Sequence, residues 1–415
     1  MPLSDRGISK DRLKSNNVYA ILSLLYKNGP MPRKDIAETI RLTPATVTML
    51  TNELMQSGML VEGGEVTDSC RAGRRKILID INYHFGCIAG IYIEHNSAVV
   101  SLTYINGSLI AKRDLVIFDG ADPEEFADGV SDAVEAMMSE AGILRAKLLC
   151  AGISVVGYVD SLHGISENSF GLFGENVDMR GIFAKRLGVP VTVDNNVRAL
   201  AVAEIDYNRS GQKINGLFIK HSPGLGGAVI INNHVYCGAH CRSGELGHFT
   251  VDPGGKKCAC GKRGCVSTIV SRSALIGKAA DILDPDTTPA LWRLCKGEPG
   301  RIDIDMLTLS AHDGDRPIYK IMDTAALELA IVIENSMELV DGDIVITFGR
   351  LLNDEYFHQK IEQKLRYISD NEITYKFRKS LIGDDELWKA SVAIAARELI
   401  RLLSENTNGV KKNEM

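Results

Sequence analysis

Three cysteines and one histidine lie close together in a glycine- and lysine-rich stretch of the sequence. The cysteines are Cys258, Cys260 and Cys265, and His248 precedes the first of them by ten positions. Three thiolates and one imidazole form a complete tetrahedral ligand set for Zn²⁺. Because the surrounding residues are typical of turns rather than of a core, the pattern predicts a metal-binding loop. The alternative is a loop that keeps its thiols without binding a metal.

Two further cysteines, Cys237 and Cys241, lie just upstream with His240 between them. They are either a second group of metal ligands or, more commonly for free cysteines, buried or incidental side chains. The first residues lack the apolar core of a signal peptide, and no apolar run approaches the ~18 residues that span a bilayer. We therefore expect a soluble, cytoplasmic protein, in which a tight cysteine cluster favours metal binding over disulfides.

The N-terminal segment predicts three helices followed by a β-hairpin. Apolar residues recur at helical spacing from Val18 to Leu25, and a short second helix covers residues 33–40. A third helix has Thr43 as its N-cap and Pro44 at its first position. This order is typical of a winged helix-turn-helix, whose recognition helix enters the major groove of DNA. The alternative is a three-helix bundle that contacts proteins.

The residues that we expect to contact DNA are small or polar on the third helix and basic elsewhere. Small and polar side chains suit contacts with base edges and phosphates, and arginines around a glycine suit a narrow minor groove. The set comprises Arg33, Thr43, Pro44, Ala45, Thr46 and Thr48, together with Arg71, Arg74 and Arg75 in the hairpin turn. For the turn, the alternative is a solvated loop without a DNA contact.

The distribution of charge also favours the N-terminus as the place of any nucleic-acid contact. Residues 1–82 hold 12 basic and 9 acidic side chains, whereas the remaining residues hold 35 basic and 44 acidic ones. A slightly basic head therefore precedes an acidic body, and the whole chain of 415 residues carries a formal charge of −6. Cationic surfaces attract the phosphate backbone, so the acidic body is the less suitable partner for DNA.

From about Tyr83, strands alternate with helices. The runs "CIAGIYIE", "AVVSLTYI" and "GSLIAKRDLVIF" predict three adjoining strands, and "KLLCAGISVVGYVD" predicts one buried strand. A hairpin with a glycine-rich turn, "HSPGLGG", follows, and the last part is mainly helical around the strand "DIVITFG". This alternation indicates an α/β fold, and the length indicates two lobes.

Taken in order, "VDNNVRALAVAE", "GELGH", "CACGKRGC" and the winged helix ending in "GRR" resemble the ROK family of repressors and sugar kinases. The likeness covers nearly the whole chain and is strongest to the family's regulators, the xylose-repressor and NagC/Mlc-like branch. It implies a winged helix-turn-helix at residues 1–82 and a two-lobed, actin-like ATPase body. The lobes are expected at residues 83–198 and 199–385, with a C-terminal helix at about 386–415 packing on the first lobe.

The resemblance also implies a sugar cleft between the lobes and a structural zinc beside it. The expected zinc ligands are His248, Cys258, Cys260 and Cys265. The zinc loop is expected to aim Glu245 at the sugar hydroxyls. The expected sugar-binding residues are Asn195, Asn196, Glu245, His248 and Ser267.

This sequence departs from the family's kinases at the residues that carry catalysis. Tyr92 replaces the aspartate of the phosphate loop, and Glu94 and His95 replace its glycines. Asn196 replaces the general base, and an amide cannot accept the proton of a sugar hydroxyl. Ser267 replaces a sugar-binding glutamate. We therefore expect no enzymatic activity.

A second glycine-rich turn is partly retained in Gly224, Gly226 and Gly227. It is explained equally well by a remnant of phosphate binding and by a tight hairpin that requires positive φ angles. The turn by itself therefore does not decide between a kinase and a protein that only shares its fold.

The sequence as a whole predicts a DNA-binding regulator, a repressor, that is controlled by a sugar or sugar derivative. The expected partners are an operator of approximate two-fold symmetry and a second copy of the chain, in a homodimer or a tetramer. One alternative is an ATP-dependent sugar or amino-sugar kinase with an appended regulatory head. Another is a body that docks a protein, such as a sugar-transport component, instead of a sugar.

Overall fold

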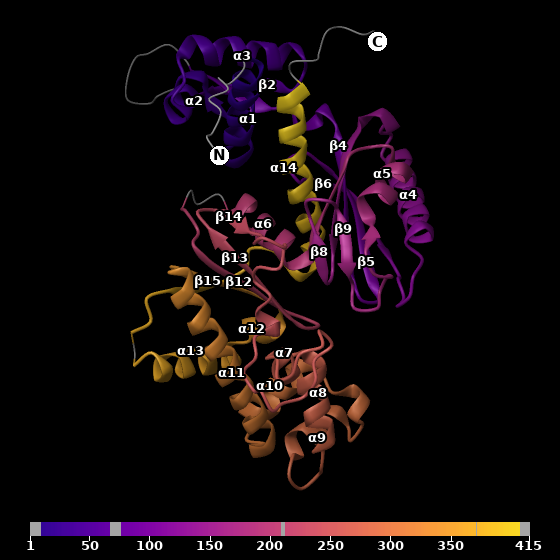
Figure 1. Ribbon diagram of the computed structural model, residues 1–415, viewed down its shortest axis with the longest axis vertical. Coiled ribbons are helices and arrows are strands. Elements are labelled where there is room, and N and C mark those ends of the chain that lie inside the picture. Colours follow the sequence, from indigo (N-terminus) through magenta and orange to yellow (C-terminus); the bar gives the residue numbers. More distant parts are fainter. Residues whose placement is uncertain (1–9, 67–75, 209–211, 371, 407–415) are drawn as a thin grey trace, which may run out of the picture.

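The computed structural model describes residues 10–66, 76–208, 212–370 and 372–406. Its N-terminal part folds as three helices on a small antiparallel sheet of order β1-β3-β2 (Figure 1). The elements are α1 (Lys10–Asn28), β1 (Met31–Pro32), α2 (Arg33–Ile40), α3 (Pro44–Gln56), β2 (Leu60–Val66) and β3 (Lys76–Ile81). The three helices and the hairpin are as predicted, and β1 is a strand that the sequence pattern did not reveal.

The first sheet of the body has the strand order β11-β7-β4-β5-β6. Its strands are β4 (Cys87–Glu94), β5 (Ser97–Tyr104), β6 (Leu109–Leu115), β7 (Leu148–Val155) and β11 (Val191–Asn195). Two helices, α4 (Pro123–Glu140) and α5 (Met179–Leu187), bury their apolar sides against one face. The other face is left for helices that come from later in the chain.

The run predicted as one long buried strand is two strands. The chain leaves β7 and turns at Gly157, whose φ is 98°. The strand β8 (Tyr158–Asp160) then joins a separate sheet with β9 (Ile165–Asn168) and β10 (Val177–Asp178), in the order β10-β9-β8. An apolar run does not reveal such a break, because both pieces are buried in the same way.

The second sheet has the order β14-β13-β12-β15-β16 and supports most of the later helices. Its strands are β12 (Gly216–His221), β13 (Leu225–Ile231), β14 (His234–Tyr236), β15 (Ile344–Phe348) and β16 (Lys376–Lys379). The helices that follow are α7 (Ser267–Val270), α8 (Arg272–Asp281), α9 (Pro289–Cys295), α10 (Ile304–His312), α11 (Arg316–Val340), α12 (Arg350–Asn353) and α13 (Glu355–Ile368). Leu217 and Ile219 of β12 face these helices, whereas Phe218 faces the opposite way.

Two helices join the sheets to each other and to the N-terminal domain. The helix α6 (Asn196–Tyr207) packs on the second sheet and against α14 (Trp388–Asn406). In turn, α14 lies against β4 and β7 of the first sheet and against α1. Figure 1 shows α14, in yellow, running from the body to the indigo N-terminal domain. The two sheets therefore share a core that contains α6 and α14.

Candidate functional site

A cavity of about 580 Å³ opens between the two lobes. Every residue predicted to bind a sugar lines it: Asn195, Asn196, Glu245, His248 and Ser267. The first two come from the junction of β11 and α6, and the others come from the chain after β14. Its size suits a small ligand, since binding sites for such molecules are concave and carry a few convergent polar groups.

The side chain of Asn195 caps the start of α6. Its side-chain oxygen accepts hydrogen bonds from the backbone N–H groups of Val197 and Arg198, which is an N-cap. Its amide donates to the carbonyl of Gly157 at 2.8 Å. Only 8% of the residue is exposed. Asn195 therefore ties the helix start to the turn after β7, and its neighbour Asn196 has more capacity to meet a ligand.

The carboxylate of Glu94 is the centre of a polar cluster at the end of β4. Its Oε1 accepts a hydrogen bond from the Tyr92 hydroxyl at 2.6 Å and one from the Asn196 amide at 3.3 Å. The ammonium of Lys220 forms an ion pair with the same oxygen at 2.6 Å and is itself only 5% exposed. Burial, and then the negative charge of Glu94, raise the pKa of Tyr92 well above its ordinary value. The cluster thus connects the first sheet, α6 and β12 of the second sheet.

Glu245 and His248 lie side by side at the rim of the cavity. Burial raises the pKa of Glu245, although Arg198 and Arg242 act in the opposite direction. The Nε2 atom of His248 lies 4.0 Å from a carboxylate oxygen of Glu245. The other ring nitrogen, Nδ1, faces Cys258 at 3.6 Å. His248 is therefore placed between the cavity and the cysteine cluster.

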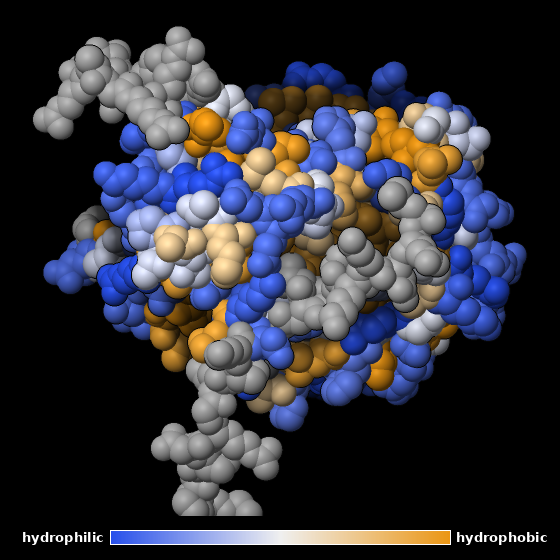
Figure 2. All heavy atoms as spheres, turned by 90° about the horizontal axis from the view of Figure 1, so that it is seen from above, coloured by the Kyte–Doolittle hydropathy of each residue, from blue (hydrophilic) through white to orange (hydrophobic). Residues whose placement is uncertain are grey.

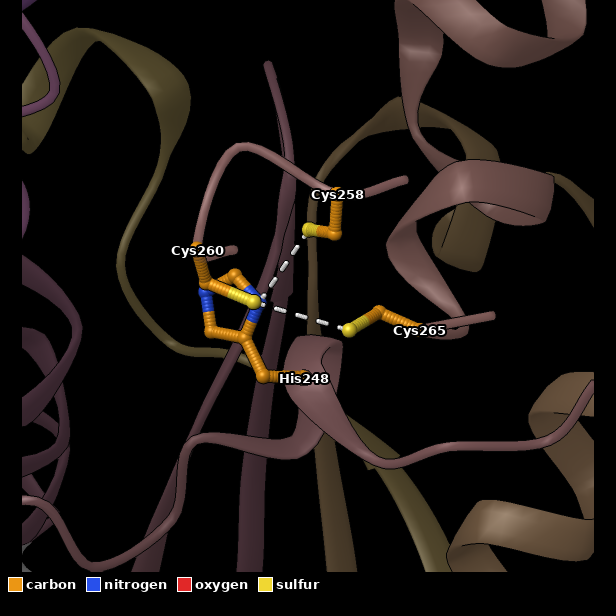
Figure 3. A group of neighbouring side chains, drawn as sticks. All are labelled: His248, Cys258, Cys260 and Cys265. Atoms are coloured by element: carbon orange, nitrogen blue, oxygen red, sulfur yellow. Dashed lines mark hydrogen bonds between the residues drawn. The ribbon is translucent and has the colours of Figure 1, made fainter. Parts of the chain in front are cut away.

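The cysteine cluster fits a tetrahedral metal. The ligand atoms of His248, Cys258, Cys260 and Cys265 all lie within 4.8 Å of one another, and Figure 3 shows them converging from separate parts of the loop. The sulfur atoms of Cys260 and Cys265 are 3.6 Å apart. Two thiolates on one Zn²⁺ at ~2.3 Å are separated by about 3.8 Å in a tetrahedron, so the spacing suits this ion.

The electrostatics of the cluster also suit a cation. Burial, and then the neighbouring thiols of Cys260 and Cys258, raise the pKa of Cys265 to about 12. A divalent cation reverses this balance, because it stabilises the thiolates that repel one another. Cys237 and Cys241 are not part of the cluster, and in the part of the chain that the structure describes no second group with metal-binding geometry is found. Of the two interpretations of these cysteines, this favours buried or incidental side chains over a second ligand group.

The second glycine-rich turn lacks the backbone conformation that one of its two explanations requires. None of Gly224, Gly226 and Gly227 has a positive φ, so the explanation by backbone conformation is wrong. A Cβ atom at Gly226 would lie 2.7 Å from a methyl group of Val197 in α6, which is too close. A Cβ atom at Gly227 would lie 2.5 Å from Leu246. These glycines let the β12–β13 hairpin approach α6 and the chain around Glu245.

In the N-terminal domain, the start of α3 is free to meet a partner. The Thr43 hydroxyl caps the helix by accepting the N–H of Thr46, and Pro44, Ala45 and Thr48 are exposed. Seen from this end of the molecule, hydrophilic and hydrophobic side chains are intermixed on the surface (Figure 2). The helix therefore presents small polar groups of the kind that fit a major groove.

The arginines predicted to contact DNA fall into two groups. The guanidinium of Arg33 donates to Thr51 at 3.0 Å and to Asn52 at 3.1 Å, so it fastens α2 to α3. Arg71, Arg74 and Arg75 lie outside the described residues.

Two buried cations near the cavity escaped the interpretation of the sequence. Lys220 is the last residue but one of the apolar strand β12, and Arg198 lies in the first turn of α6, where its side chain is 2% exposed. Arg198 pairs with Asp194 at 2.6 Å and donates to the carbonyls of Val159 and Cys241. A charged residue at the end of an apolar strand was the available signal for Lys220. The sequence of α6 gave no such signal for Arg198, because the helix is buried from Asn196 to Asp206 and so has no exposed face for a charged residue to mark.

Comparisons with known proteins agree with this division of the chain. Residues 97–401 match the ROK family, and residues 14–61 match the MarR family. A xylose repressor from Caldicellulosiruptor bescii is 26% identical over 359 residues, which cover 86% of this chain and 88% of that protein. A xylose repressor from Bacillus subtilis is 30% identical over 272 residues, covering 64% of this chain and 68% of that protein.

Solved structures show the same fold at low sequence identity. A ROK family transcriptional regulator, described as a homolog of the E. coli MLC protein, superposes with a TM-score of 0.78 at 22% identity. It covers 96% of this chain and 100% of its own. A ROK family glucokinase from Streptomyces griseus, in complex with glucose and AMPPNP, superposes with a TM-score of 0.62 at 22% identity. That match covers 75% of this chain and 98% of the kinase, and leaves the N-terminal domain without a counterpart.

Proposed function

This chain belongs to the ROK family, and from that membership we propose that it is a transcriptional repressor whose DNA binding is controlled by a sugar. One observation carries the proposal: a single helix, α14, contributes side chains both to the core of the N-terminal domain and to the core of the body. Ile400 and Leu403 pack with the three N-terminal helices. Trp388, Val392 and Leu399 pack with the first sheet.

The shared helix is also linked to the cavity. The helix α6 begins at Asn196 in the cavity and ends beside α14, where Asp206 forms a bidentate ion pair with Arg397 at 2.6 and 2.8 Å. Tyr26 of α1 packs into the core around α14. A ligand that shifts the start of α6 can therefore move α14, and with it the DNA-binding helices. Such a coupling requires only that the ligand binds one arrangement of these elements better than another.

The Glu94 cluster supports a sensor rather than a kinase. A phosphate group that entered along β4 would meet a carboxylate that is held by Tyr92, Asn196 and Lys220. Phosphoryl transfer depends on positioned cations and backbone N–H groups around the phosphates, whereas the carboxylate of Glu94 repels a phosphate and neutralises the charge of Lys220. Asn196, in the place of the general base, cannot take the proton of the sugar hydroxyl.

Within this proposal, His248, Cys258, Cys260 and Cys265 hold a structural zinc. A zinc with four protein ligands supplies folding free energy and no open coordination position. The metal loop then fixes the ring of His248 by its Nδ1 atom and leaves Nε2 toward Glu245. In this way the loop positions Glu245, with Asn196 and Ser267, for hydrogen bonds to a sugar.

The proposed partner is duplex DNA with approximate two-fold symmetry, bound by a homodimer. Closed symmetric dimers match symmetric sites, and the start of α3 would enter one major groove for each protomer. Thr43, Pro44, Ala45, Thr46 and Thr48 would contact that groove, and Arg71, Arg74 and Arg75 would reach the flanking minor groove.

The test uses the full-length, zinc-loaded protein. A selection from random duplex DNA should enrich one motif, whose affinity is then measured with D-xylose, D-glucose and N-acetyl-D-glucosamine present in turn. One of these sugars should weaken DNA binding by about tenfold or more, in the usual range of coupling free energies. Glu245→Gln should abolish the response to the sugar and leave DNA binding unchanged.

Three outcomes would contradict parts of the proposal. If the selection enriches no motif, the proposal that the chain is a sequence-specific repressor is wrong. ATP-dependent phosphorylation of a sugar by the wild-type protein would favour the kinase. DNA binding that no sugar alters would favour a body that docks another protein.

A further inference from the structure

Cys237 and Cys241, which the proposed function does not use, meet at a contact between the two lobes. Both follow β14 in the second lobe, and their sulfur atoms lie 3.6 and 3.5 Å from the hydroxyl of Ser161. Ser161 belongs to the turn between β8 and β9 of the first lobe. The two thiols contact the same hydroxyl, and their residues are four positions apart in one loop. Small movements can therefore bring the sulfur atoms together.

The loop that carries these thiols is fastened to the first lobe at Cys241 and Arg242. The buried guanidinium of Arg198 donates to the carbonyl of Cys241 and to that of Val159 in β8. Arg242 pairs with Glu167 of β9 at 2.8 Å and covers the ring of Tyr158 at 4.6 Å. The backbone N–H of Ser243 closes the loop on the carbonyl of Cys237 at 3.1 Å. Glu245 of the ligand cavity follows two residues later.

The surroundings distinguish this pair from the other free cysteines. Cys87, Cys150 and Cys295 are fully buried in the hydrophobic cores, each without a second thiol on a shared hydroxyl. Cys237 is partly exposed, and Cys241 is 5% exposed beside it. A water-sized reagent therefore has a path to the pair, which it lacks in the cores.

The two thiols also differ in acidity. Burial, and then the hydrogen bond to Cys241, raise the pKa of Cys237 to about 11. Burial acts in the same direction on Cys241, but hydrogen bonds from Ser161 and Cys237, together with the charge of Arg198, hold its pKa below the ordinary value. One thiol that ionises readily beside one that does not is the usual arrangement of an attacking and a resolving cysteine.

We propose that Cys237 and Cys241 are a redox-active pair, which hydrogen peroxide converts to an intramolecular disulfide that loosens the contact between the lobes. The thiolate of Cys241 attacks one oxygen of the peroxide, the O–O bond breaks, and hydroxide leaves and takes up a proton. The sulfur is then a sulfenic acid. The sulfur of Cys237 attacks it, an S–S bond forms, and the sulfenic oxygen leaves as water with the proton of the second thiol. In total, two thiols lose two electrons and two protons, and one peroxide becomes two waters.

The disulfide would act on the ligand cavity, a consequence that rests on the proposed function. It draws both sulfurs away from the Ser161 hydroxyl, so the second lobe loses this contact with the first. The carbonyl of Cys241 moves with its sulfur and weakens the bond from Arg198. Because the loop continues into Glu245, the oxidised protein binds its sugar less tightly.

The disulfide can be measured without any knowledge of the ligand. Trypsin cuts after Lys220 and after Arg242, and the peptide 221–242 contains Cys237, Cys241 and no other cysteine. Reduced, zinc-loaded, full-length protein is treated with hydrogen peroxide, denatured, alkylated with iodoacetamide and digested. The peptide should lose both alkyl labels and be lighter than its reduced form by two hydrogens, at peroxide doses that leave the zinc content unchanged. Dithiothreitol should restore both labels.

Single variants separate the attacking cysteine from the resolving one. In Cys237→Ser, the sulfenic acid should persist on Cys241 and react with dimedone, whereas Cys241→Ser should acquire no dimedone label on this peptide. Ser161→Ala should slow disulfide formation, since the hydroxyl no longer stabilises the thiolate. Full alkylation of the wild-type peptide at doses that already release zinc would overturn the proposal. So would a peptide that gains oxygen, or one linked to a second chain.

The effect on ligand binding is a separate measurement. Calorimetry with D-xylose, D-glucose and N-acetyl-D-glucosamine compares the reduced and oxidised proteins. The oxidised protein should bind its sugar about tenfold more weakly, which corresponds to about 1.4 kcal/mol. Equal affinities of the reduced and oxidised proteins would contradict the proposed loosening of the lobes. They would not contradict the formation of the disulfide. If the reduced protein binds none of the three, the sugar part of the proposed function fails, and the peptide result still decides whether the pair is redox-active.

Discussion

At the scale of residues, one carboxylate, Glu94, carries the proposal that this chain does not transfer phosphate. The Oε1 atom of Glu94 accepts hydrogen bonds from Tyr92, Asn196 and Lys220, which come from three elements. An exposed acid could swing aside for a phosphate, but a carboxylate with a buried ammonium at 2.6 Å is held by that charge. Within the proposed function, the difference from a kinase site therefore lies in this ion-paired cluster as well as in single replaced side chains.

Restoring the missing base should therefore not restore transfer. Asn196→Asp would place a second carboxylate beside Glu94, in the position of an amide that now donates to it at 3.3 Å. Like charges at that distance oppose each other, so the new side chain would bind a proton rather than accept one from a sugar. A coupled assay of ADP release with D-xylose, D-glucose and N-acetyl-D-glucosamine should show no turnover above background. Turnover in this variant would mean that Glu94 does not block phosphate.

The zinc prediction belongs to the same scale. Purified protein should contain about one zinc per chain, and Cys265→Ser should lose it, since three ligands hold the ion far less tightly than four. Cys295→Ser, which changes an equally buried cysteine in α9, should keep its zinc. Metal analysis by plasma mass spectrometry decides the matter. Zinc-free wild-type protein, prepared without chelators, would contradict the assignment.

At the scale of elements, α6 and α14 are the parts on which the cavity and the DNA-binding domain both depend. Every described residue of α6 from Asn196 to Asp206 is buried, which is unusual for a helix that carries charged side chains. Its buried acidic side chains form ion pairs: Asp206 with Arg397, and Glu204 with Arg378, both at 2.6 Å. A helix of this kind transmits movement as a rigid body because its surroundings leave no room for it to deform.

Breaking one of these pairs should cost far more than breaking a surface pair on the same helix. Arg397→Gln leaves the carboxylate of Asp206, 1% exposed, without its cation, which costs about 3–5 kcal/mol of unfolding free energy. Arg401→Gln removes an arginine that is 46% exposed and bonded to Glu398 and Glu405, at a cost below about 1 kcal/mol. Urea unfolding followed by tryptophan fluorescence compares the two variants. Equal shifts would show that the inner pair does not stabilise the joint.

At the scale of the whole molecule, the proposed homodimer would bring together two DNA-binding domains and two cavities. The described residues include no helix long and apolar enough to cross a bilayer. The exposed start of α3 lies at the end of the molecule where α14 meets α1, so movements of the body reach the DNA-binding helices directly (Figure 1). A dimer would double this effect, because both domains must keep the spacing of successive major grooves.

Base preference should depend on Thr48. This exposed side chain of α3 bonds only to the carbonyl of Pro44 in its own helix, so it can turn to a base edge. Thr48→Ala should change the preferred core bases by about 1–3 kcal/mol at one position of each half-site. Thr39→Ala alters a threonine of α2 that bonds to its own helix in the same way, and it should leave the motif unchanged. Selection from random DNA with each variant is the measurement, and an unaltered motif for Thr48→Ala would contradict the placement of α3.

The arginines predicted for the hairpin turn offer a second measurement on DNA. Arg75→Ala should weaken binding most where A·T-rich sequences flank the core, because arginine in a minor groove responds to groove width more than to bases. The loss should shrink as salt concentration rises, since released counterions supply much of the affinity. Affinities for duplexes with A·T-rich and G·C-rich flanks, at two salt concentrations, decide it. Unchanged affinity on both would mean that Arg75 does not contact DNA.

The sequence by itself determined whatever depends on neighbours along the chain. The bounds of α2 and the cap of α3 follow from Pro32, Thr43 and Pro44, and the cysteine spacing identified the metal loop. The resemblance to the ROK family, carried by such local motifs, indicated the sugar-binding residues, and these line the cavity. Local signals of this kind survive folding, since caps, turns and short ligand spacings are set by the backbone within a few residues.

Only the tertiary structure decided which side chains remain available. The sequence assigned Arg33 to DNA and Asn195 to the sugar, and only the fold shows that Arg33 also bonds to α3 and that Asn195 also caps α6. The sequence could not pair Lys220 with Glu94, or place Ser161 on two thiols, because these partners are far apart in the chain. It left the glycines of the β12–β13 turn open between a phosphate-binding remnant and a backbone conformation, whereas the approach of Val197 in α6 requires Gly226 and that of Leu246 requires Gly227. The physical reason is that burial and packing depend on elements that meet only after the chain has folded, and no pattern within one segment records them.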